Sequence, residues 1–138
     1  MNTSTARIHP ETQPDNRSQH MHYLILINDP PYGTERVFNG LRLAHALLKK
    51  ADDNRVDVFL MADAVVGANA GQKTPDGFYN VERMLRRVLA GDRGRVLLCG
   101  TCMDARGMSD DDTMDGPRRS TMDELAQITA DADKVIVF

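Results

Sequence analysis

At 138 residues, this chain fits a single domain that is large enough to bury a core without disulfides or bound metal. Apolar residues make up 41% and charged residues 27%, as in an ordinary globular protein. The net charge of −3 gives no sign of the basic surface that binds nucleic acid, and an aromatic content of 5% without Trp gives little for base stacking. No apolar run is long enough to cross a bilayer, so we expect no membrane partner.

The first 20 residues are polar and contain Pro10 and Pro14 without an apolar stretch. We therefore expect a disordered tail over residues 1–20, no secretory signal peptide, and one domain over residues 21–138. The two cysteines of the chain are Cys99 and Cys102. In a protein that is not secreted, a lone pair is more often redox-active, catalytic or buried than a structural disulfide, so the expected compartment is the cytoplasm.

Predicted strands and helices alternate from residue 22 onward. The apolar run at 22–28 predicts a strand buried on both faces, which ends at Pro30 and Pro31. An amphipathic helix follows at 34–50, with Thr34 as its expected N-cap. Residues 55–61 predict the second strand, and residues 64–68 a short helical turn.

The second half of the chain continues this alternation. After a loop at 71–77 we expect a helix at about 80–90, and then a third strand at 95–99 that ends at Cys99. Thr121 and Glu124 match a capping box at the start of the last helix, and residues 134–138 predict a final strand. The pattern predicts an α/β fold, with a single doubly wound domain and a mostly parallel five-stranded sheet covered by helices on both faces. These segments locate four of the five strands.

The strongest chemical feature is the sequence CGTC at residues 99–102, where a buried strand ends. In open α/β sheets, ligands and reactive groups gather at the carboxyl ends of the strands. Backbone N–H groups of the next turn, together with Arg106, are expected to stabilise a thiolate on Cys99. A thiolate is the species that attacks a persulfide or a disulfide. The opposing interpretation makes Cys99 an inert apolar residue of the core.

Metal binding finds less support in the sequence. A zinc site needs four ligands, and no second C-x-x-C or close histidine pair supplies the others, while His45 is expected at the surface. Residues 111–122 approach a calcium loop, but Thr113 at its third position and Met122 at its twelfth exclude one. The acidic residues of this segment therefore indicate a solvated loop. We expect no metal and no cofactor.

Two further segments contain residues that could bind an anion. Residues 30–34 contain one glycine, too few for a convincing phosphate-binding loop. Because this loop and the cysteine loop both follow strand carboxyl ends, Tyr32, Gly33 and Thr34 are expected to pack against the cysteines and support them. Arg118 and Arg119 could bind an anion, but adjacent arginines on a surface loop need no function.

Four segments together resemble the DsrE-like sulfur-relay family, in its branch with two cysteines. They are PYGTERVFNGLRLAHALLK at 31–49, VDVFLMADAV at 56–65, CGTCMDARGM at 99–108 and the terminal ADKVIVF. The resemblance extends from about residue 23 to residue 138 and implies a doubly wound domain that assembles into a homotrimer or homohexamer. Some members of the family carry sulfur as a persulfide on a cysteine at the end of the third strand, the position of Cys99.

Cys102 departs from the single cysteine typical of the relay subunits in this family. As a resolving thiol it would release the carried sulfur as sulfide by forming the 99–102 disulfide. The leading hypothesis is a small sulfurtransferase-like carrier that exchanges sulfur with a donor and an acceptor protein. Two alternatives stay open: a non-catalytic oligomeric scaffold with silent cysteines, and a thiol–disulfide redox protein.

Overall fold

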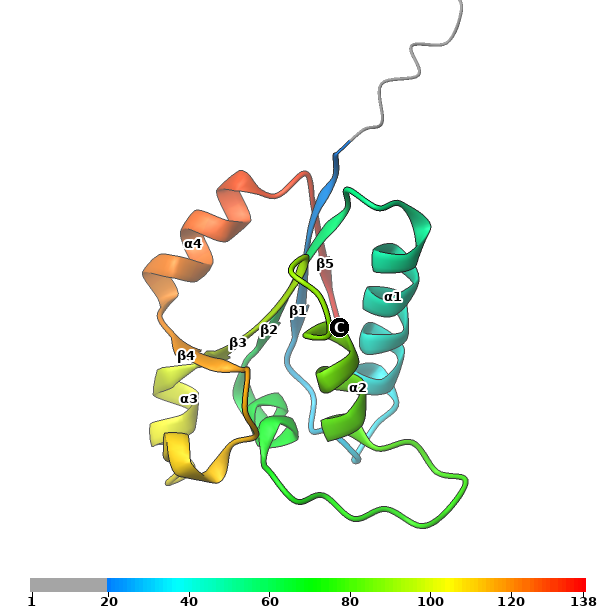
Figure 1. The fold of residues 1–138 in the computed structure, drawn as a ribbon. Helices are drawn as coiled ribbons and strands as arrows, with labels where there is room; N and C mark the ends of the chain where they lie inside the picture. Colours follow the sequence, from blue (N-terminus) through cyan, green and yellow to red (C-terminus); the bar gives the residue numbers. More distant parts are fainter. Residues whose placement is uncertain (1–19) are drawn as a thin grey trace, which may run out of the picture.

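The computed structural model describes residues 20–138, in which helices and strands alternate (Figure 1). The strands are β1 (His22–Ile27), β2 (Arg55–Leu60), β3 (Gly94–Cys99), β4 (Arg118–Ser120) and β5 (Lys134–Val137). The helices are α1 (Arg36–Lys50), α2 (Val81–Val88), α3 (Gly100–Asp104) and α4 (Met122–Asp131), with 3-10 segments η1 (Ala62–Ala68) and η2 (Asp110–Asp112). Apart from His20, the tail expected over residues 1–20 lies outside the described residues.

The five strands form one sheet in the order β4-β3-β2-β1-β5, and each neighbouring pair is parallel. The predicted α/β fold with a five-stranded sheet is therefore confirmed. The strand that sequence analysis did not locate is β4, which pairs Arg118 with Leu97 and Ser120 with Cys99. Because β4 has three residues and exposes both of its arginines, it lacks the apolar pattern that marks the other strands.

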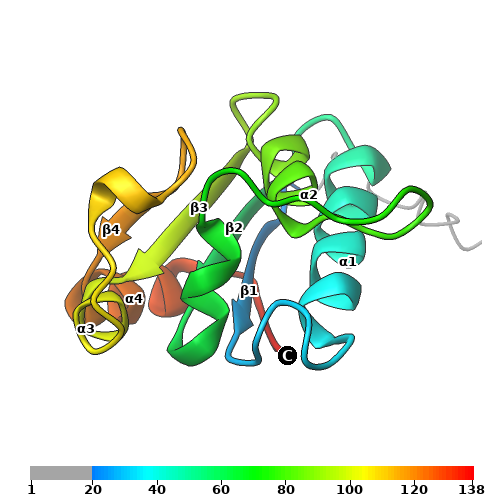
Figure 2. The same ribbon diagram turned by 90° about the horizontal axis from the view of Figure 1, so that it is seen from below.

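The helices cover the two faces of the sheet unequally. Helices α1 and α2 lie side by side on one face, and α4 lies on the other (Figures 1 and 2). The chain builds β1 to β4 in one direction, then crosses back along α4 and adds β5 next to β1. In the described part of the chain, no helix is long and apolar enough to span a membrane.

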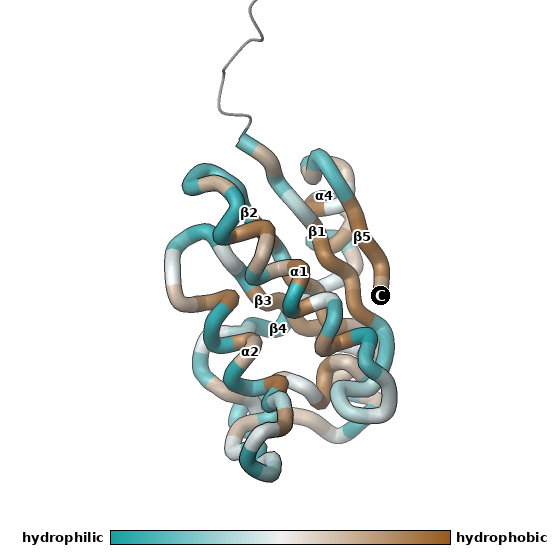
Figure 3. The backbone as a smooth tube through the Cα atoms, turned by 90° about the vertical axis from the view of Figure 1, so that its right-hand side faces the viewer, coloured by the Kyte–Doolittle hydropathy of each residue, from teal (hydrophilic) through white to brown (hydrophobic). Residues whose placement is uncertain are grey.

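The face under α1 and α2 is an apolar layer. Alternate side chains of a strand point to opposite faces, and parallel partners in register point to the same face. By this rule the layer contains the buried side chains of Tyr23, Ile25, Ile27, Val56, Val58, Leu60, Val96 and Leu98. Gly40 allows helix α1 to pack close to this layer. An added Cβ at this position would lie 2.9 Å from Cδ1 of Ile27 and 3.2 Å from Cδ2 of Phe138. Figure 3 shows the hydrophobic colour along most of β1 and β5.

His45 of α1 corrects one expectation of the sequence. It is half-buried instead of lying at the surface, and its Nε2 is 2.8 Å from the carbonyl oxygen of Met84 in α2. Burial lowers the pKa of His45, outweighing the contrary effect of that hydrogen bond. The histidine therefore joins the two helices in its neutral form.

Helix α4 begins with half of the predicted capping box. The Thr121 hydroxyl accepts the N–H of Glu124 at 3.2 Å, as expected for an N-cap. The carboxylate of Glu124 does not return to the backbone of Thr121. It accepts hydrogen bonds from Arg118 and from the Ser120 hydroxyl instead, and these contacts fasten β4 to the first turn of α4.

Candidate active site at the cysteine pair

Cys99 is the last residue of the buried strand β3, which lies between β2 and β4, and its side chain lies on the face covered by α4. Only 8% of the residue is exposed. Its Sγ accepts the backbone N–H of Cys102 at 3.3 Å, so the thiol caps the short helix α3. Gly100 permits this turn, because a Cβ there would lie 3.1 Å from the carbonyl oxygen of Ser120. The predicted delivery of Cys99 to the carboxyl edge of the sheet is thus what the structure shows.

Cys102 lies in α3 and is half-buried, so it is the more accessible thiol of the pair. Its Sγ accepts the backbone N–H of Ala62 at 3.2 Å. Ala62 lies two residues after the last residue of β2 and has φ of 48°, a left-handed conformation. Two neighbouring strand ends therefore meet at the site: the thiols lie at the end of β3 and in α3 just after it, and the N–H donor Ala62 begins η1, just after the end of β2.

Arg106 was expected to stabilise a thiolate on Cys99, but its guanidinium contacts a carboxylate and a backbone carbonyl oxygen. Its Nε lies 2.9 Å from Oδ1 of Asp63, and its Nη2 lies 2.8 Å from the same oxygen. Its Nη1 donates to the carbonyl oxygen of Cys102 at 3.0 Å. The guanidinium therefore joins the turn after β2 to α3, and its charge is paired with a carboxylate.

The electrostatics of Cys99 run against the environment expected for a reactive thiolate. Burial raises the pKa of the Cys99 thiol, and its side-chain hydrogen bond with Cys102 raises it further. The N–H groups of Cys102 and Thr101 oppose this without reversing it. Cys99 therefore holds its proton more firmly than an ordinary cysteine, and the expectation of a low pKa from its position alone is wrong.

Both thiols open onto one pocket of about 220 Å³. It is lined by Phe59, Met61, Cys99, Thr101, Cys102, Ser120, Thr121 and Met122. None of these side chains carries a fixed charge. The volume is below the roughly 300–1,000 Å³ of sites for drug-sized ligands, so the pocket suits a few atoms or the end of a chain. Met122 stands largely exposed, at 62% of its surface.

The walls of this pocket were not identified from the sequence. Phe59 lies near the end of β2 and Met61 just after it, whereas Thr121 and Met122 lie at the start of α4. Phe59 alternates with Val58 along a buried strand, and nothing in that apolar run marks the residue that would face a thiol. The capping signal at Thr121 located the helix start but not its neighbour across the sheet.

The loop at residues 30–34 lies elsewhere. The Tyr32 hydroxyl donates to Oε1 of Gln72 and accepts the N–H of Val81 at 3.0 Å, while its ring stacks on Tyr79 with centroids 5.7 Å apart. Gly33 lies against Pro30 of its own loop, where an added Cβ would be 2.8 Å from Cγ. The loop therefore packs on the start of α2, and the expected packing of Tyr32 and Gly33 against the cysteine loop is wrong.

Thr34 also has a local role. Helix α1 begins at Arg36 with Glu35 as N-cap, so Thr34 lies one position too early to be the predicted cap. Its hydroxyl still accepts the N–H of Arg36 at 3.3 Å and donates to Asp29 at 2.9 Å. These hydrogen bonds stabilise the start of α1, and neither of them involves a cysteine.

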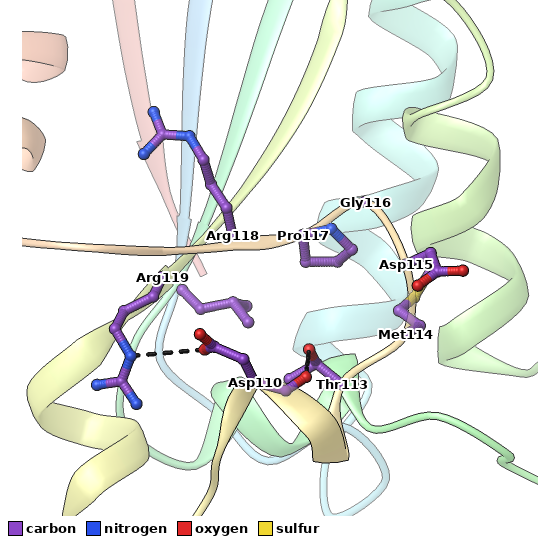
Figure 4. Close-up of a pocket in the computed structure, with 9 residues that line it drawn as sticks. Asp110, Thr113, Met114, Asp115, Gly116, Pro117, Arg118 and Arg119 are labelled. Carbon is purple, nitrogen blue, oxygen red and sulfur yellow. Dashed lines mark hydrogen bonds and ion pairs between the residues drawn. The ribbon is translucent and has the colours of Figure 1, made fainter.

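A second, polar pocket of about 260 Å³ lies beside β4 (Figure 4). Asp110, Arg118 and Arg119 belong to its lining. Arg119 pairs with Asp104 at 2.8 Å and Asp110 at 3.6 Å, and Arg118 pairs with Glu124. Both arginines are engaged with carboxylates, so this pocket has little positive charge left for an anion. Among residues 20–138, no group of three or more His, Cys, Asp or Glu side chains is arranged to hold a metal ion.

Comparisons with known proteins agree with this fold. The model of the DsrE/DsrF-like family matches residues 21–138. Protein YchN of Escherichia coli (strain K12) is 44% identical over 115 residues, which cover 83% of this chain and 97% of that protein. The crystal structure of the E. coli ychN protein matches with a TM-score of 0.80 and 43% identity, covering 86% of this chain and 99% of that chain. Sulfurtransferase TusD of Salmonella typhi is 24% identical over 129 residues, covering 86% of this chain and 100% of that protein.

Proposed function

The chain belongs to the DsrE/DsrF-like family, and we propose that it is a sulfur carrier that holds sulfane sulfur as a persulfide on Cys99, with Cys102 as resolving thiol. The observation that carries the proposal is two free thiols on one small uncharged pocket, each accepting a backbone N–H. The similarity to a protein named a sulfurtransferase supports the same class of chemistry at the level of the family.

Loading begins when a donor persulfide places its terminal sulfur in the pocket. Cys99 Sγ attacks that sulfur, the donor's S–S bond breaks, and the donor leaves as a thiolate. The proton of Cys99 passes to the Cys102 thiolate, with which it shares a hydrogen bond. This transfer gives Cys102 a role in loading, because burial otherwise keeps Cys99 protonated.

Release follows one of two balanced routes. An acceptor thiolate attacks the terminal sulfur of the Cys99 persulfide, which leaves Cys99 as a thiolate and the acceptor as a persulfide. Alternatively, Cys102 gives up its proton to the departed donor thiolate and attacks Sγ of Cys99. That step forms the 99–102 disulfide and expels hydrosulfide, and a dithiol reductant then restores both thiols.

The pocket around Cys99 and Cys102 is suited to holding a persulfide. The uncharged lining disfavours water and free ions, so a persulfide in the pocket is shielded from other thiols. The exposed side of the pocket at Met122 leaves room for a chain end that carries the reacting sulfur. The proposal includes a donor and an acceptor protein as partners, assembly of this chain as a homotrimer or homohexamer, and a cytoplasmic location where thiols stay reduced.

The test is sulfur loading of the reduced full chain by inorganic polysulfide, followed by intact mass spectrometry and a sulfide assay. Cys102→Ser should accumulate one added sulfur atom on Cys99. The unmodified chain should load, then form an internal disulfide and release an equal amount of sulfide. Cys99→Ser should keep no added sulfur, and the double serine variant reports non-specific uptake.

Other results would overturn the proposal in distinct ways. Wild-type loading by Cys99→Ser would reverse the roles of the two thiols. A disulfide formed without prior uptake of sulfur would favour the thiol–disulfide redox protein. No change in any variant would favour the scaffold with silent cysteines.

A further inference from the structure

Ala62 has a backbone conformation that requires an explanation. It is the single non-glycine residue with positive φ among residues 20–138, at 48°. A side chain in the left-handed region is disfavoured because Cβ crowds the neighbouring backbone, and such a residue persists only where its surroundings hold it. Its N–H points to Cys102 Sγ at 3.2 Å, although the two residues are 40 positions apart in the chain. A strained residue that contacts a candidate reactive group suggests a functional constraint.

The surroundings that hold Ala62 can be identified. The next residue, Asp63, accepts two N–H groups of Arg106, from Nε at 2.9 Å and from Nη2 at 2.8 Å. The third nitrogen of the same guanidinium donates to the carbonyl oxygen of Cys102 at 3.0 Å. The planar side chain of Arg106 therefore connects Asp63, the neighbour of the N–H donor Ala62, to Cys102, whose sulfur accepts that N–H.

We propose that Asp63 and Arg106 are positioning residues that hold the Ala62 N–H on Cys102 Sγ and so favour the thiolate form of Cys102, the form that accepts the Cys99 proton during loading. A hydrogen bond donated to sulfur favours its charged form. Cys99 also accepts an N–H, but it is the more deeply buried of the two. The inference rests on the proposed function, in which Cys102 first accepts the Cys99 proton and later attacks the persulfide.

Charge alone predicts a different outcome from positioning, which makes the inference testable. The charged and titratable groups around Cys102 are Cys99 on β3, Asp63 on η1, Asp104 on α3 with its partner Arg119 on β4, and Arg106. If Arg106 acted only through its charge, removing it would disfavour a thiolate, and removing the negative Asp63 would favour one. If the pair acts by positioning, removing either partner disfavours the thiolate.

The experiment measures the rate of alkylation by iodoacetamide, a neutral reagent, as a function of pH. All variants are made in a Cys99→Ser background, so that Cys102 is the one thiol present. Arg106→Gln and Asp63→Asn should each slow alkylation at pH 7 by about three- to tenfold, the range that one hydrogen bond contributes, and move the profile to higher pH. Arg106→Lys should fall between, because an ammonium lacks the planar fork that reaches both acceptors.

Arg86→Gln is the matched control, because it breaks an exposed ion pair with Glu82 of similar length, 3.0 Å, on α2. It should leave the alkylation profile unchanged. Faster alkylation in Asp63→Asn, or an unchanged rate in either Arg106→Gln or Asp63→Asn, would overturn the inference. Because alkylation needs no sulfur donor, this result is independent of the loading test: sulfur uptake with an unmoved profile would reject the positioning role alone.

Discussion

The two faces of the sheet differ in what they bury. Under α1 and α2 the strands present an almost wholly apolar layer, into which Gly40 allows α1 to pack closely. Under α4 the same strands carry the Cys99 thiol and the buried carboxylate of Asp57, which is 3% exposed. Only Leu125 and Ile128 of α4 are buried there, and Val137 at the β5 edge is 60% exposed.

Asp57 shows how the second face keeps a charge inside the fold. Its carboxylate accepts Nε and Nη2 of Arg95, each at 2.7 Å, and lies 2.7 Å from Nε2 of His22. Burial by itself would raise the pKa of Asp57, but the hydrogen bonds from Arg95 and His22 hold it below the ordinary value. The face under α1 and α2 therefore contributes mainly hydrophobic stabilisation. The face under α4 buries polar and reactive groups, whose desolvation reduces its net contribution to stability.

The largest expected effect comes from truncating a buried leucine of α1, the helix that covers the apolar layer. Leu41 is fully buried in α1, so Leu41→Ala should lower the free energy of unfolding by about 2–5 kcal/mol. The matched change Leu26→Ala, at a half-buried leucine on the α4 face, should cost about half as much. Urea unfolding measures both. An equal loss at Leu26 would break the comparison, because it would mean that another surface covers this face.

A smaller loss is expected at Asp57. Asp57→Asn should cost about 2 kcal/mol at pH 7, less than for a fully buried pair because Arg95 stays partly solvated. Since the folded carboxyl has a lowered pKa, its stabilising effect is complete above the unfolded value of about 4 and is lost as pH falls through the folded value. Urea midpoints of both proteins should therefore converge in acid, and a constant difference down to pH 2 would contradict the assignment.

The smallest effect on stability is expected at the exposed edge. Val137→Lys should change the free energy of unfolding of a separated chain by less than about 0.5 kcal/mol. If the proposed homo-oligomer covers this apolar edge, the same change should shift sedimentation toward the monomer of 15.4 kDa. Lys134→Glu, at an exposed residue of the same strand, serves as control. Unaltered assembly of Val137→Lys would place the subunit contact elsewhere.

Local signals explain how much of this fold the sequence predicted. The apolar runs at β1, β2 and β3, the prolines after β1 and the cap at Thr121 each act within a few residues, so they can be read without knowing what packs against them. The same signals placed Cys99 at a strand end and Cys102 in the first turn beyond it. Strand β4 was not predicted because it is stabilised by pairing with β3, and its arginines by ion pairs of Arg118 with Glu124 and of Arg119 with Asp104, which no apolar pattern shows.

By itself, then, the sequence determined the alternation of elements, the α/β fold and the place of the thiol pair at the carboxyl edge of the sheet. The tertiary structure alone decided what faces that pair. Ala62 reaches Cys102 across 40 residues and Asp63 reaches Arg106 across 43, whereas Tyr32 was expected beside the cysteines and packs on α2. Such contacts depend on strand order and on the position of each turn, because hydrogen bonds and burial act between neighbours in space, whatever their separation in the chain.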